Sequence, residues 1–381
     1  MKINLLTSSR ADFSLLKNLI FEMQKNKKFK LKLIATGSHF SKKLGNSYKE
    51  ILESKIKIHH KIKISNNISS PKKLLKDMGT INNKLAGIIN SNKPDLFIVL
   101  GDRHEVLFSA LTAYISKIPI AHIHGGELTS GSLDDGYRHS ITKLSSIHFA
   151  SHREYKNRII QLGEQPKFVF NVGGLGAENI KKTRLLNRNQ LEKKLKIKFK
   201  NSIFTINIQP EISKEKTILL TKEVLQVLNK QKEKTLIFTL PGSDKFNEII
   251  IKKLRKFVKK NTNAYLFKTL GGIKFLSCLK ISDAIIGNSS SGILEMPSFK
   301  NATINIGNRQ KGRIKAKSII DVKPKSSAIN KAVKFIYSKK FRLIKSKSFN
   351  PYYKKSTAKK IVKIVNTINL KKLKIKTFYN L

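Results

Sequence analysis

The sequence predicts an α/β protein with two mostly parallel, doubly wound sheets, one in each half of the chain. Two observations support this prediction. Short β-branched apolar runs alternate with amphipathic helix-like stretches, and polar or glycine-rich clusters follow several of the runs. The 381 residues are too many for one simple core, and a hydrophobic content of 40% is typical of a folded protein. Because open sheets bind ligands beyond the carboxyl ends of their strands, we expect a ligand cleft between the two halves.

Strands and helices are expected to alternate along each half. In the first half the expected strands are Lys2–Leu6, Leu31–Ala35, Leu96–Leu100, Ile118–Ile123, Ile147–Ala150 and Phe168–Val172. The expected helices there are Ser14–Asn26, Lys73–Ser91, Val106–Ser116 and Arg138–Ser145. In the second half the expected strands are Ser202–Ile208, Thr235–Leu240, Ala264–Lys268, Ala284–Ile286 and Ala302–Ile306.

These elements predict two Rossmann-like domains, residues 1–178 and 179–355, with the boundary in the glycine-rich and then basic stretch Gly173–Asn189. Residues 356–381 form a basic C-terminal segment that includes a helix. This segment is a candidate to pack back on the first domain.

The charge of the chain is unusual, because 77 Lys and Arg residues face 24 Asp and Glu residues, a formal net charge of +53. Such a balance makes nucleic acid, an anionic membrane surface or an anionic substrate a plausible partner. However, the lysines are spread over almost every segment, without zinc-finger spacing or a separate basic arm. We therefore expect no specific nucleic-acid partner, and nucleic-acid binding is kept only as a lower alternative.

Cys278 is the only cysteine, which excludes an intramolecular disulfide and a cysteine-cluster metal site. No apolar run approaches the length of a membrane-spanning helix, and the N-terminus becomes polar too early for a signal peptide. The sequence thus predicts a soluble, cytoplasmic protein without a membrane partner.

The most informative motif is the run from Ala284 to Glu295, AIIGNSSSGILE. It reads as a strand that ends at Gly287, a loop of small hydroxyl residues, and a helix that Pro297 keeps short. Backbone N–H groups and the start of a helix then point at one spot, which favours phosphate. The alternative is an ordinary strand-to-helix turn capped by serine.

Two polar clusters follow the first two expected strands. In the first cluster, Arg10 could pair with phosphate and Ser14 could cap a helix or bind the ligand. The second cluster ends in His39. The alternatives are a capped helix start for the first cluster and a structural hydrogen-bonding role for His39.

Two further clusters are rich in carboxylates. Asp102 and Arg103 lie at the mouth of a buried strand, where such residues rarely serve packing alone. Glu127 ends the next strand, and the chain continues to Asp134 and Asp135. Three carboxylates and three imidazoles between positions 122 and 139 indicate acid/base chemistry, because close carboxylates raise one another's pKa. A metal site is the weaker alternative, since no ligand pair with i, i+4 spacing has a third ligand nearby.

In the second half, Arg309, Lys311 and Arg313 follow the strand that ends at Gly307. These cations are suited to neutralising a diphosphate near the serine loop, although in so basic a chain they could also be a solvated charge run.

Taken together, these clusters resemble the hydrolysing UDP-N-acetylglucosamine 2-epimerases that start sialic-acid synthesis, and their relatives acting on diacetamido-trideoxyhexose nucleotides. The matching strings occur in family order over residues 1–365: SRAD at 9–12, TGSH at 36–39, GDR at 101–103, HIHGGE at 122–127, DDGYRHSIT at 134–142, GNSSSGILE at 287–295 and GNRQKGR at 307–313. Each string is weak alone, but the ordered set is highly specific.

The resemblance implies the glycosyltransferase-B fold and an elimination–hydration reaction on a nucleotide sugar. A base removes the C2 proton while the nucleoside diphosphate leaves C1, and water then adds at C1 as a proton returns to the other face of C2. The resemblance implies no cofactor, and the dinucleotide glycine fingerprint is missing after the first strand. It also suggests a homo-oligomer.

By position, the resemblance gives acid/base roles to Asp102, Glu127 and Asp134 or Asp135, without deciding which carboxylate takes the C2 proton. His39 and His139 are supporting candidates. The positions that it maps to substrate binding are Arg10, Ser14, Arg103, Gln209, Ser289, Ser290, Glu295 and Arg309.

The chain departs from the family pattern at two places. Gln209 stands where a histidine is usual in His-Pro-Glu, and Gly242 stands where an asparagine is usual in Pro-Asn-x-Asp, which here reads Pro241 to Asp244. Glutamine can donate a hydrogen bond to a phosphate oxygen but cannot shuttle a proton. These departures put the level of activity and the substrate in question.

The leading interpretation is conversion of UDP-N-acetylglucosamine to N-acetylmannosamine and UDP. The nearest rival is the same chemistry on a UDP- or GDP-linked 2,4-diacetamido-2,4,6-trideoxyglucose, as in legionaminic-acid synthesis. A non-hydrolysing epimerase and a glycosyltransferase that shares the fold are less favoured.

Overall fold

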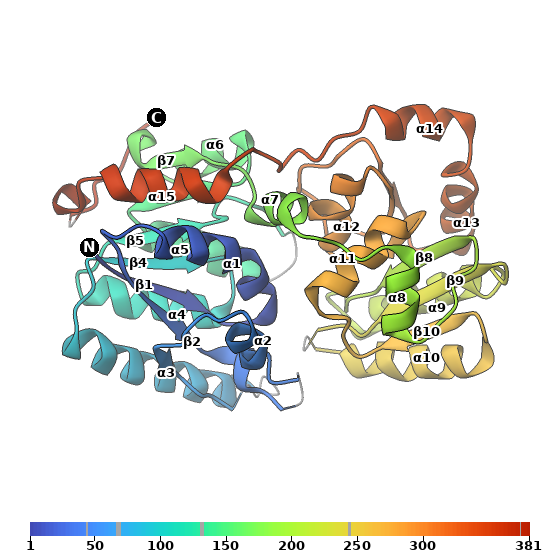
Figure 1. The fold of residues 1–381 in the computed structure, drawn as a ribbon, viewed down its shortest axis with the longest axis horizontal. Helices are drawn as coiled ribbons and strands as arrows, with labels where there is room; N and C mark the ends of the chain where they lie inside the picture. Colours follow the sequence, from blue (N-terminus) through green and yellow to red (C-terminus); the bar gives the residue numbers. More distant parts are fainter. Residues whose placement is uncertain (43–44, 66–69, 130–132, 243–244, 374) are drawn as a thin grey trace. The chain divides into compact units, whose positions relative to one another are not determined.

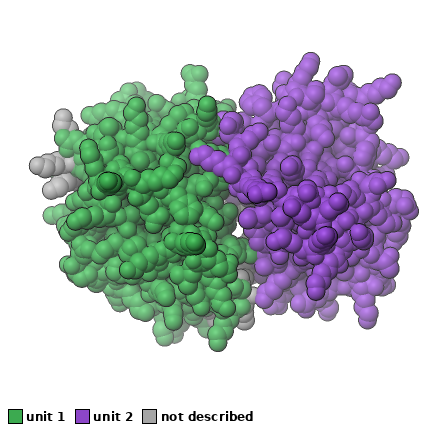
Figure 2. All heavy atoms as spheres, viewed as in Figure 1, with its two compact units in different colours: residues 1–127, 133–179, 354–381 green, residues 128–132, 180–353 purple. Residues whose placement is uncertain are grey.

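The computed structural model describes residues 1–42, 45–65, 70–129, 133–242, 245–373 and 375–381. The chain divides into two compact units, coloured separately in Figure 2. Unit 1 comprises Met1–Glu127, Leu133–Asn179 and Lys354–Leu381, and unit 2 comprises Leu128–Ser132 and Ile180–Tyr353. Both chain ends therefore belong to unit 1.

Unit 1 contains a sheet whose strands are all parallel, in the order β3-β2-β1-β4-β5-β6-β7 (Figure 1). The strands are β1 (Lys2–Thr7), β2 (Lys30–Ala35), β3 (His60–Lys61), β4 (Leu96–Leu100), β5 (Ile120–Ile123), β6 (Ile147–Ala150) and β7 (Val169–Asn171). The order reverses between β1 and β4, so the carboxyl ends of these two central strands form the switch point at which such sheets bind ligands.

Helices cover both faces of this sheet, because successive strand residues point to opposite sides. Leu5 belongs to the core on one face and Leu6 to the core on the other. The helices of unit 1 are α1 (Arg10–Gln24), α2 (Tyr48–Glu53), α3 (Pro71–Ser91), α4 (His104–Ile115), α5 (Leu133–Leu144), α6 (Arg153–Gln161), α7 (Leu175–Lys182), which continues into unit 2, and α15 (Thr357–Thr367).

The helix α15 lies in unit 1 although it follows all of unit 2 in the chain (Figure 1). Its apolar residues Ala358, Ile361 and Val365 are fully buried in the same core as Leu16 and Ile20 of α1. Burial of this stripe at i, i+3 and i+7 holds the C-terminal segment on unit 1.

Unit 2 contains a second sheet of parallel strands in the order β10-β9-β8-β11-β12-β13. The strands are β8 (Ser202–Asn207), β9 (Lys234–Thr239), β10 (Ala264–Phe267), β11 (Ala284–Gly287), β12 (Ala302–Ile306) and β13 (Ile319–Val322). The helices are α8 (Arg188–Leu195), α9 (Lys214–Leu228), α10 (Asn247–Lys260), α11 (Gly271–Ile281), α12 (Ser291–Leu294), α13 (Ser326–Phe335) and α14 (Lys339–Ser346).

The predicted α/β fold with two parallel sheets is confirmed, and each predicted strand has a counterpart. Two further strands were not predicted: β3, which has only two residues, and β13, whose residues are exposed or half-buried. The stretch Gly173–Asn189, predicted as a boundary, contains all of α7, and the two units meet in the chain between Asn179 and Ile180. The predicted cleft stays a prediction.

Within the described ranges, no helix has both the length and the apolar character needed to cross a membrane.

Candidate active site

The loop after β1 is organised around a buried carboxylate, Asp12. Its Oδ2 accepts hydrogen bonds from the Ser8 backbone N–H at 3.1 Å and the Ser8 hydroxyl at 2.6 Å. Burial raises the pKa of Asp12, and the charge of Arg103 acts in the opposite direction. The N-cap of α1 is Ser9, whose Oγ accepts from the Asp12 N–H at 3.2 Å. The predicted capping role of Ser14 is therefore wrong, because Ser14 lies inside α1 with an exposed side chain.

Arg10 is the first residue of α1, and its Nη1 lies 3.9 Å from Glu50 Oε1. Both side chains are well exposed, so this ion pair contributes little to stability and leaves the guanidinium accessible to solvent. Arg10 thus lies just after the carboxyl end of β1, and its phosphate contact stays a prediction.

His39 is fully buried in the loop after β2, and both of its ring nitrogens have partners. Nε2 lies 2.9 Å from Thr7 Oγ1, and Nδ1 lies 2.9 Å from Ser47 Oγ. Burial, with a smaller contribution from Arg103, lowers the pKa of His39 to about 4. The ring is neutral at pH 7 and ties three segments of unit 1 together, which supports the structural alternative for this histidine.

Arg103 is held by Glu105, a residue to which the sequence analysis gave no role. The Nε and Nη2 atoms of Arg103 donate to the two carboxylate oxygens of Glu105, both at 3.1 Å. Burial alone would raise the pKa of Glu105, but Arg103 outweighs it and lowers that pKa. This bidentate pair fixes the guanidinium, and a third of the Arg103 side chain stays exposed.

The same carboxylate explains the glycine of the TGSH string. Gly37 has φ of +60°, and a Cβ there would lie 2.9 Å from Glu105 Oε1 and 2.5 Å from the Ser8 carbonyl oxygen. Only glycine lets the loops after β1, β2 and β4 approach this closely.

Arg138 of α5 brings the predicted acid/base residues together. Its guanidinium donates to a carboxylate oxygen of Asp102, to Asp135 Oδ1 at 3.0 Å and to the Glu127 carbonyl at 2.9 Å. The Arg138 side chain is only 1% exposed, so these bonds are shielded from water. The loops after β4 and β5 and the start of α5 therefore converge on one buried cation.

The carboxylate of Glu127 is oriented separately. Its Oε1 accepts from the Ser151 hydroxyl at 3.0 Å and lies 3.7 Å from His124 Nδ1. The preceding Gly126 has φ of +76°, and a Cβ there would overlap the Tyr155 carbonyl. This close contact between the backbones of Gly126 and Tyr155 fixes the position of the backbone from which the Glu127 side chain extends.

Asp134 and His139 also lie on α5, near Arg138. Asp134 is on the first turn, and its charge acts on Arg103 and Tyr137. His139 Nε2 is 3.7 Å from Asp135 Oδ2, and its buried Nδ1 has no hydrogen-bond partner among the described residues. Burial lowers the pKa of His139.

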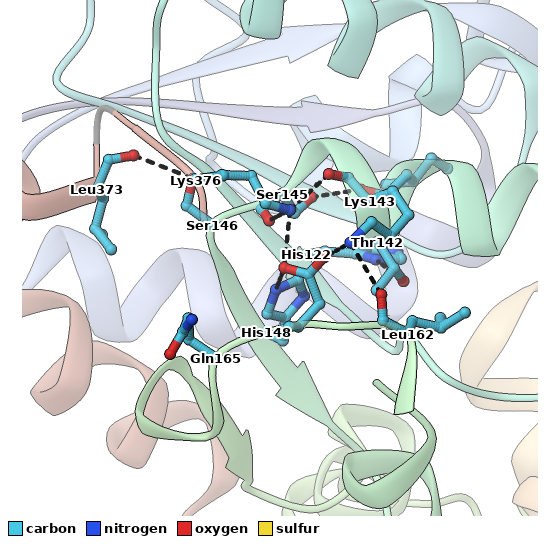
Figure 3. Close-up of polar contacts among 12 residues, drawn as sticks. His122, Thr142, Lys143, Ser145, Ser146, His148, Leu162, Gln165, Leu373 and Lys376 are labelled. Atoms are coloured by element: carbon cyan, nitrogen blue, oxygen red, sulfur yellow. Dashed lines mark hydrogen bonds and ion pairs between the residues drawn. The ribbon is translucent and has the colours of Figure 1, made fainter. Parts of the chain in front are cut away.

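His122 connects the two elements that carry these carboxylates (Figure 3). It is fully buried, with Nε2 2.8 Å from the Gly101 carbonyl oxygen and Nδ1 3.2 Å from Thr142 Oγ1. Burial lowers its pKa to about 3, so the neutral ring donates from Nε2 to Gly101, next to Asp102, and contacts α5 through Nδ1. A Cβ at Gly125 would lie 2.9 Å from both His122 Nδ1 and Thr142 Oγ1, which explains that glycine.

In unit 2, the serine loop follows β11 as predicted. Gly287 has φ of +142°, and a Cβ there would overlap the Asn207 carbonyl oxygen, so only glycine fits. Ser289 Oγ accepts from the Ser291 N–H at 3.3 Å, and Ser290 precedes the helix without capping it through its side chain. The helix α12 has only four residues, so hydroxyls and backbone N–H groups, not a long helix dipole, are what the loop offers to an anion.

Asn288, which is fully buried, ties this loop to its neighbours. Its Oδ1 accepts from the Gln209 N–H at 2.7 Å, and its Nδ2 donates to the Gln209 carbonyl at 3.0 Å and to Glu211 Oε1 at 2.9 Å. Its own carbonyl accepts from Gln310 Nε2 at 3.0 Å. The loops after β8, β11 and β12, adjacent strands at the switch point of this sheet, are thus held as one surface.

The two departures from the family pattern are in contact. Gly242 donates its backbone N–H to Gln209 Oε1 at 3.1 Å, and Gln209 Nε2 donates to Asn207 Oδ1 at 2.6 Å. The carboxamide of Gln209 is therefore oriented by the protein itself. Ser243 and Asp244 of the same motif lie outside the described residues.

Glu295 and Arg309 complete the predicted set in unit 2. Glu295 follows α12, and its buried Oε2 has no hydrogen-bond partner within the described part of the chain. Burial raises the pKa of Glu295 to about 7, against the effect of a Ser291 hydrogen bond. Arg309 is half-buried in the loop after β12. The same loop carries Arg313, whose Nη2 donates to Thr129 Oγ1 at 3.4 Å.

The structure thus gathers the predicted residues of unit 1 at the carboxyl ends of β1, β2, β4 and β5, and those of unit 2 at the carboxyl ends of β8, β11 and β12. Three residues, Glu105, Arg138 and Asn288, were not predicted as site residues from the sequence. Arg138 stands three positions after Asp135, a spacing that places both on one helix face and could have revealed the pair. Among the described residues, no group of three His, Cys, Asp or Glu side chains is arranged to hold a metal ion.

The chain is similar to known proteins over most of its length. A family model described as UDP-N-acetylglucosamine 2-epimerase matches residues 21–366. The chain is 41% identical over 343 residues to the hydrolysing GDP/UDP-N,N'-diacetylbacillosamine 2-epimerase of Campylobacter jejuni, a match that covers 90% of this chain and 88% of that protein. It is 36% identical over 383 residues to a polysialic acid biosynthesis protein of Escherichia coli, covering 100% and 97% of the two chains.

Among solved structures, the UDP-GlcNAc 2-epimerase of Neisseria meningitidis bound to UDP-GlcNAc is similar, with a TM-score of 0.83 and 19% identity. The match covers 97% of this chain and 100% of that one. At this identity the likeness shows the fold alone, and it confirms the glycosyltransferase-B architecture.

Proposed function

Because the chain belongs to the hydrolysing UDP-N-acetylglucosamine 2-epimerase family and is a nucleotide-sugar 2-epimerase, we propose that it acts on a nucleoside-diphosphate-linked 2-acetamido sugar. The products are the free sugar epimerised at C2 and the nucleoside diphosphate. One observation carries the assignment of the chemistry, the convergence of Asp102, Asp135 and the Glu127 backbone on the buried Arg138.

The reaction consumes one water molecule and needs no redox cofactor. A carboxylate takes the proton from C2, the C1–O bond breaks, and the nucleoside diphosphate leaves with the electron pair, giving a C1=C2 glycal. Water then adds its hydroxyl to C1, and a proton is delivered to the opposite face of C2. Two proton transfers on opposite faces call for more than one carboxyl group.

We assign these transfers to Asp102, Glu127 and Asp134 or Asp135 of unit 1. A weakly acidic C2 proton demands accurate alignment of the base, and Arg138 and Ser151 hold these side chains in fixed positions. His139 assists through Asp135. His39 is assigned a structural role.

We assign nucleotide binding to unit 2. Ser289, Ser290 and Arg309 offer hydroxyls and a cation to the phosphates, and Glu295 offers a carboxyl group to the ribose hydroxyls. Gln209, with its carboxamide already oriented, is a donor to the leaving-group oxygen. This assignment is supported by the position of these residues on or next to the loops that the hydrogen bonds of Asn288 hold together. Arg10, Arg103 and Ser14 of unit 1 remain candidates for substrate contacts.

The preferred substrate is the nucleotide-linked N,N'-diacetylbacillosamine, a 2,4-diacetamido-2,4,6-trideoxyglucose, because the relative at 41% identity carries that name. UDP-N-acetylglucosamine, the leading interpretation from the sequence, becomes the second candidate, favoured by the family description. A homo-oligomeric state stays a prediction.

The test is incubation of the purified protein in deuterated water with each nucleotide sugar in turn, followed by proton NMR. We expect free sugar with the inverted C2 configuration, deuterated at C2, together with UDP or GDP. The sugar with the higher kcat/KM is the substrate. Release of nucleotide with retained C2 protium and configuration would contradict the elimination mechanism, and turnover of none of these sugars would contradict the proposed function.

A further inference from the structure

The end of the chain lies across the C-terminal end of α5 in unit 1 (Figure 3). Ser146 Oγ donates to the Leu373 carbonyl at 3.4 Å, and Leu373 is buried in the core. Further along, Gln165 Nε2 donates to Thr377 Oγ1 at 3.1 Å, and the Tyr379 N–H donates to the Gly163 carbonyl at 2.9 Å. The terminal segment is therefore seated on unit 1 at several separate points.

Gly163 is shaped to receive this segment. It has φ of +85°, and the ring of Phe378 occupies the space where a Cβ at Gly163 would lie. The ammonium of Lys143, from α5, lies 5.0 Å from the centre of the Phe378 ring. The aromatic side chain is thus held between the loop after α6 and the last turn of α5.

The central contact of the segment is made by Lys376. Its Nζ donates to the carbonyls of Lys143 and Ser145, both at 2.5 Å, and lies 2.8 Å from Glu164 Oε2. The two carbonyls lie at the end of α5, where helix carbonyls lack intrahelical partners and a positive charge is favoured. Only 19% of the Lys376 side chain is exposed, so water screens these contacts weakly.

Glu164 joins three elements at this point. It is 3% exposed and accepts from Lys143 Nζ at 2.8 Å and from His148 Nε2 at 3.0 Å, besides its ion pair with Lys376. Burial alone would raise the pKa of Glu164, but the hydrogen bond from His148, the charge of Lys376 and the hydrogen bond from Lys143 lower it to about 2. The carboxylate is ionised at neutral pH, and it links the end of α5, the strand β6 and the terminal segment.

The other end of α5 carries the acid/base residues. Asp134 and Asp135 are on its first turn, and Arg138 is on the next. A helix of twelve residues moves as one piece, so its position at the first turn depends on how its last turn is anchored. The His122 contact to Thr142 restrains the side of the helix, and the Lys376 contacts restrain its end.

We propose that Lys376 is a positioning residue for the acid/base carboxylates of α5, acting from the C-terminus of the chain through the end of that helix. The proposal rests on the proposed function of these carboxylates. A misplacement of about 1 Å can cost about 10²-fold in rate, so a modest tilt of α5 lowers kcat. Because unit 2 carries the proposed nucleotide contacts, nucleotide affinity is expected to stay unchanged.

The experiment compares full-length Lys376→Met, Lys376→Arg and Lys359→Met with the wild type. Methionine keeps the apolar stem without the charge, arginine keeps a cationic donor, and Lys359 is an exposed lysine of α15 that serves as the matched control. For Lys376→Met we expect a fall in kcat of about 10-fold with KM within about 2-fold, and partial recovery with arginine. We also expect faster hydrogen exchange in the second half of α5, with α1 and unit 2 unchanged.

Two results would overturn the proposal. One is wild-type kcat with wild-type exchange in α5 for Lys376→Met at a temperature where every variant is folded. The other is loss of exchange protection throughout unit 1, together with weaker UDP binding by calorimetry, which would indicate general destabilisation. The exchange measurement needs no substrate, so a wild type without turnover would count against the proposed function, while the anchoring of α5 by Lys376 would still be decided.

Discussion

His122 is a buried histidine of the candidate site that is uncharged at neutral pH. His122 donates to the carbonyl that precedes Asp102 and contacts the helix that carries Asp135, so it fixes the distance between two acid/base elements. Its low pKa, about 3, excludes a role as proton shuttle at neutral pH. His122 therefore contributes by positioning the two elements that carry Asp102 and Asp135, and not by transferring a proton.

Two substitutions separate the contacts of His122. Glutamine can keep the donor to Gly101, because its amide nitrogen reaches as far as Nε2, whereas asparagine can keep only the contact to Thr142. We expect His122→Asn to lower kcat by about 10²-fold and His122→Gln by less, with the limbs of the pH–rate profile unmoved in both. Steady-state kinetics across pH 5–9 measures this. A shifted limb in either variant would show that His122 titrates during the reaction.

Glu295 makes the stability of the protein depend on pH near neutrality. Its pKa is raised by burial to about 7, above its ordinary value of 4.5. Between these values the folded protein holds a proton that the unfolded chain has released, so this carboxyl's contribution to stability falls as pH rises through that window. We expect Glu295→Gln to gain stability relative to the wild type from pH 5 to pH 8. Urea unfolding at both pH values measures the difference, and a constant difference would contradict it.

The candidate residues of this site could be predicted where they follow apolar strands, because an apolar run that changes to glycine and polar residues is a recognisable pattern in the sequence. Asp102, Glu127 and Ser289 all have that signal. Asn288 stands beside Ser289, but its contacts to Gln209 and Glu211 span 79 and 77 residues. Glu105 pairs with Arg103 only two positions away, but its close approach to Gly37 joins the loops after β2 and β4. Such tertiary contacts leave no local pattern.

At the scale of elements, the β11 turn shows how backbone geometry builds a ligand surface. Gly287 ends the strand with a φ of +142°, a conformation that other residues rarely adopt. Its α-carbon lies against the carbonyl of Asn207 on the neighbouring strand β8. Asn288 then turns inward and holds the loop after β8. The other strands were predictable from their apolar runs, whereas β3 has only two residues and β13 (Ile319–Val322) is exposed or half-buried and contains Asp321.

The glycine requirement at this turn can be tested with a matched pair. In Gly287→Ala the new Cβ meets backbone that cannot move aside, and we expect a loss of at least about 3 kcal/mol in unfolding free energy. In Gly242→Ala the nearest atom to the new Cβ among the described residues is Gln209 Oε1 at 3.8 Å, an ordinary contact, and we expect a change within about 0.5 kcal/mol. Chemical denaturation measures both. Equal effects would mean that the β11 turn relaxes without cost.

At the scale of the whole molecule, a formal net charge of +53 is spread over a chain that belongs to a nucleotide-sugar 2-epimerase family. So large an excess of positive charge affects the stability of the folded protein. Like charges repel one another more in the compact state than in the expanded one, so self-repulsion opposes folding. The ion pairs of the buried sites, such as Arg138 with Asp135, are shielded from salt, whereas the exposed lysines are not.

Salt is therefore expected to stabilise this protein. Raising sodium chloride from about 20 mM to about 300 mM shortens the Debye length from roughly 20 Å to below 10 Å, which screens repulsion between exposed lysines but hardly weakens the buried pairs. We expect the melting temperature to rise by several degrees, with most of the rise at the low end of the range. Calorimetry at fixed pH measures it, and potassium chloride as a second salt controls for the cation. A melting temperature that falls with salt would mean that exposed ion pairs outweigh the repulsion of the excess lysines.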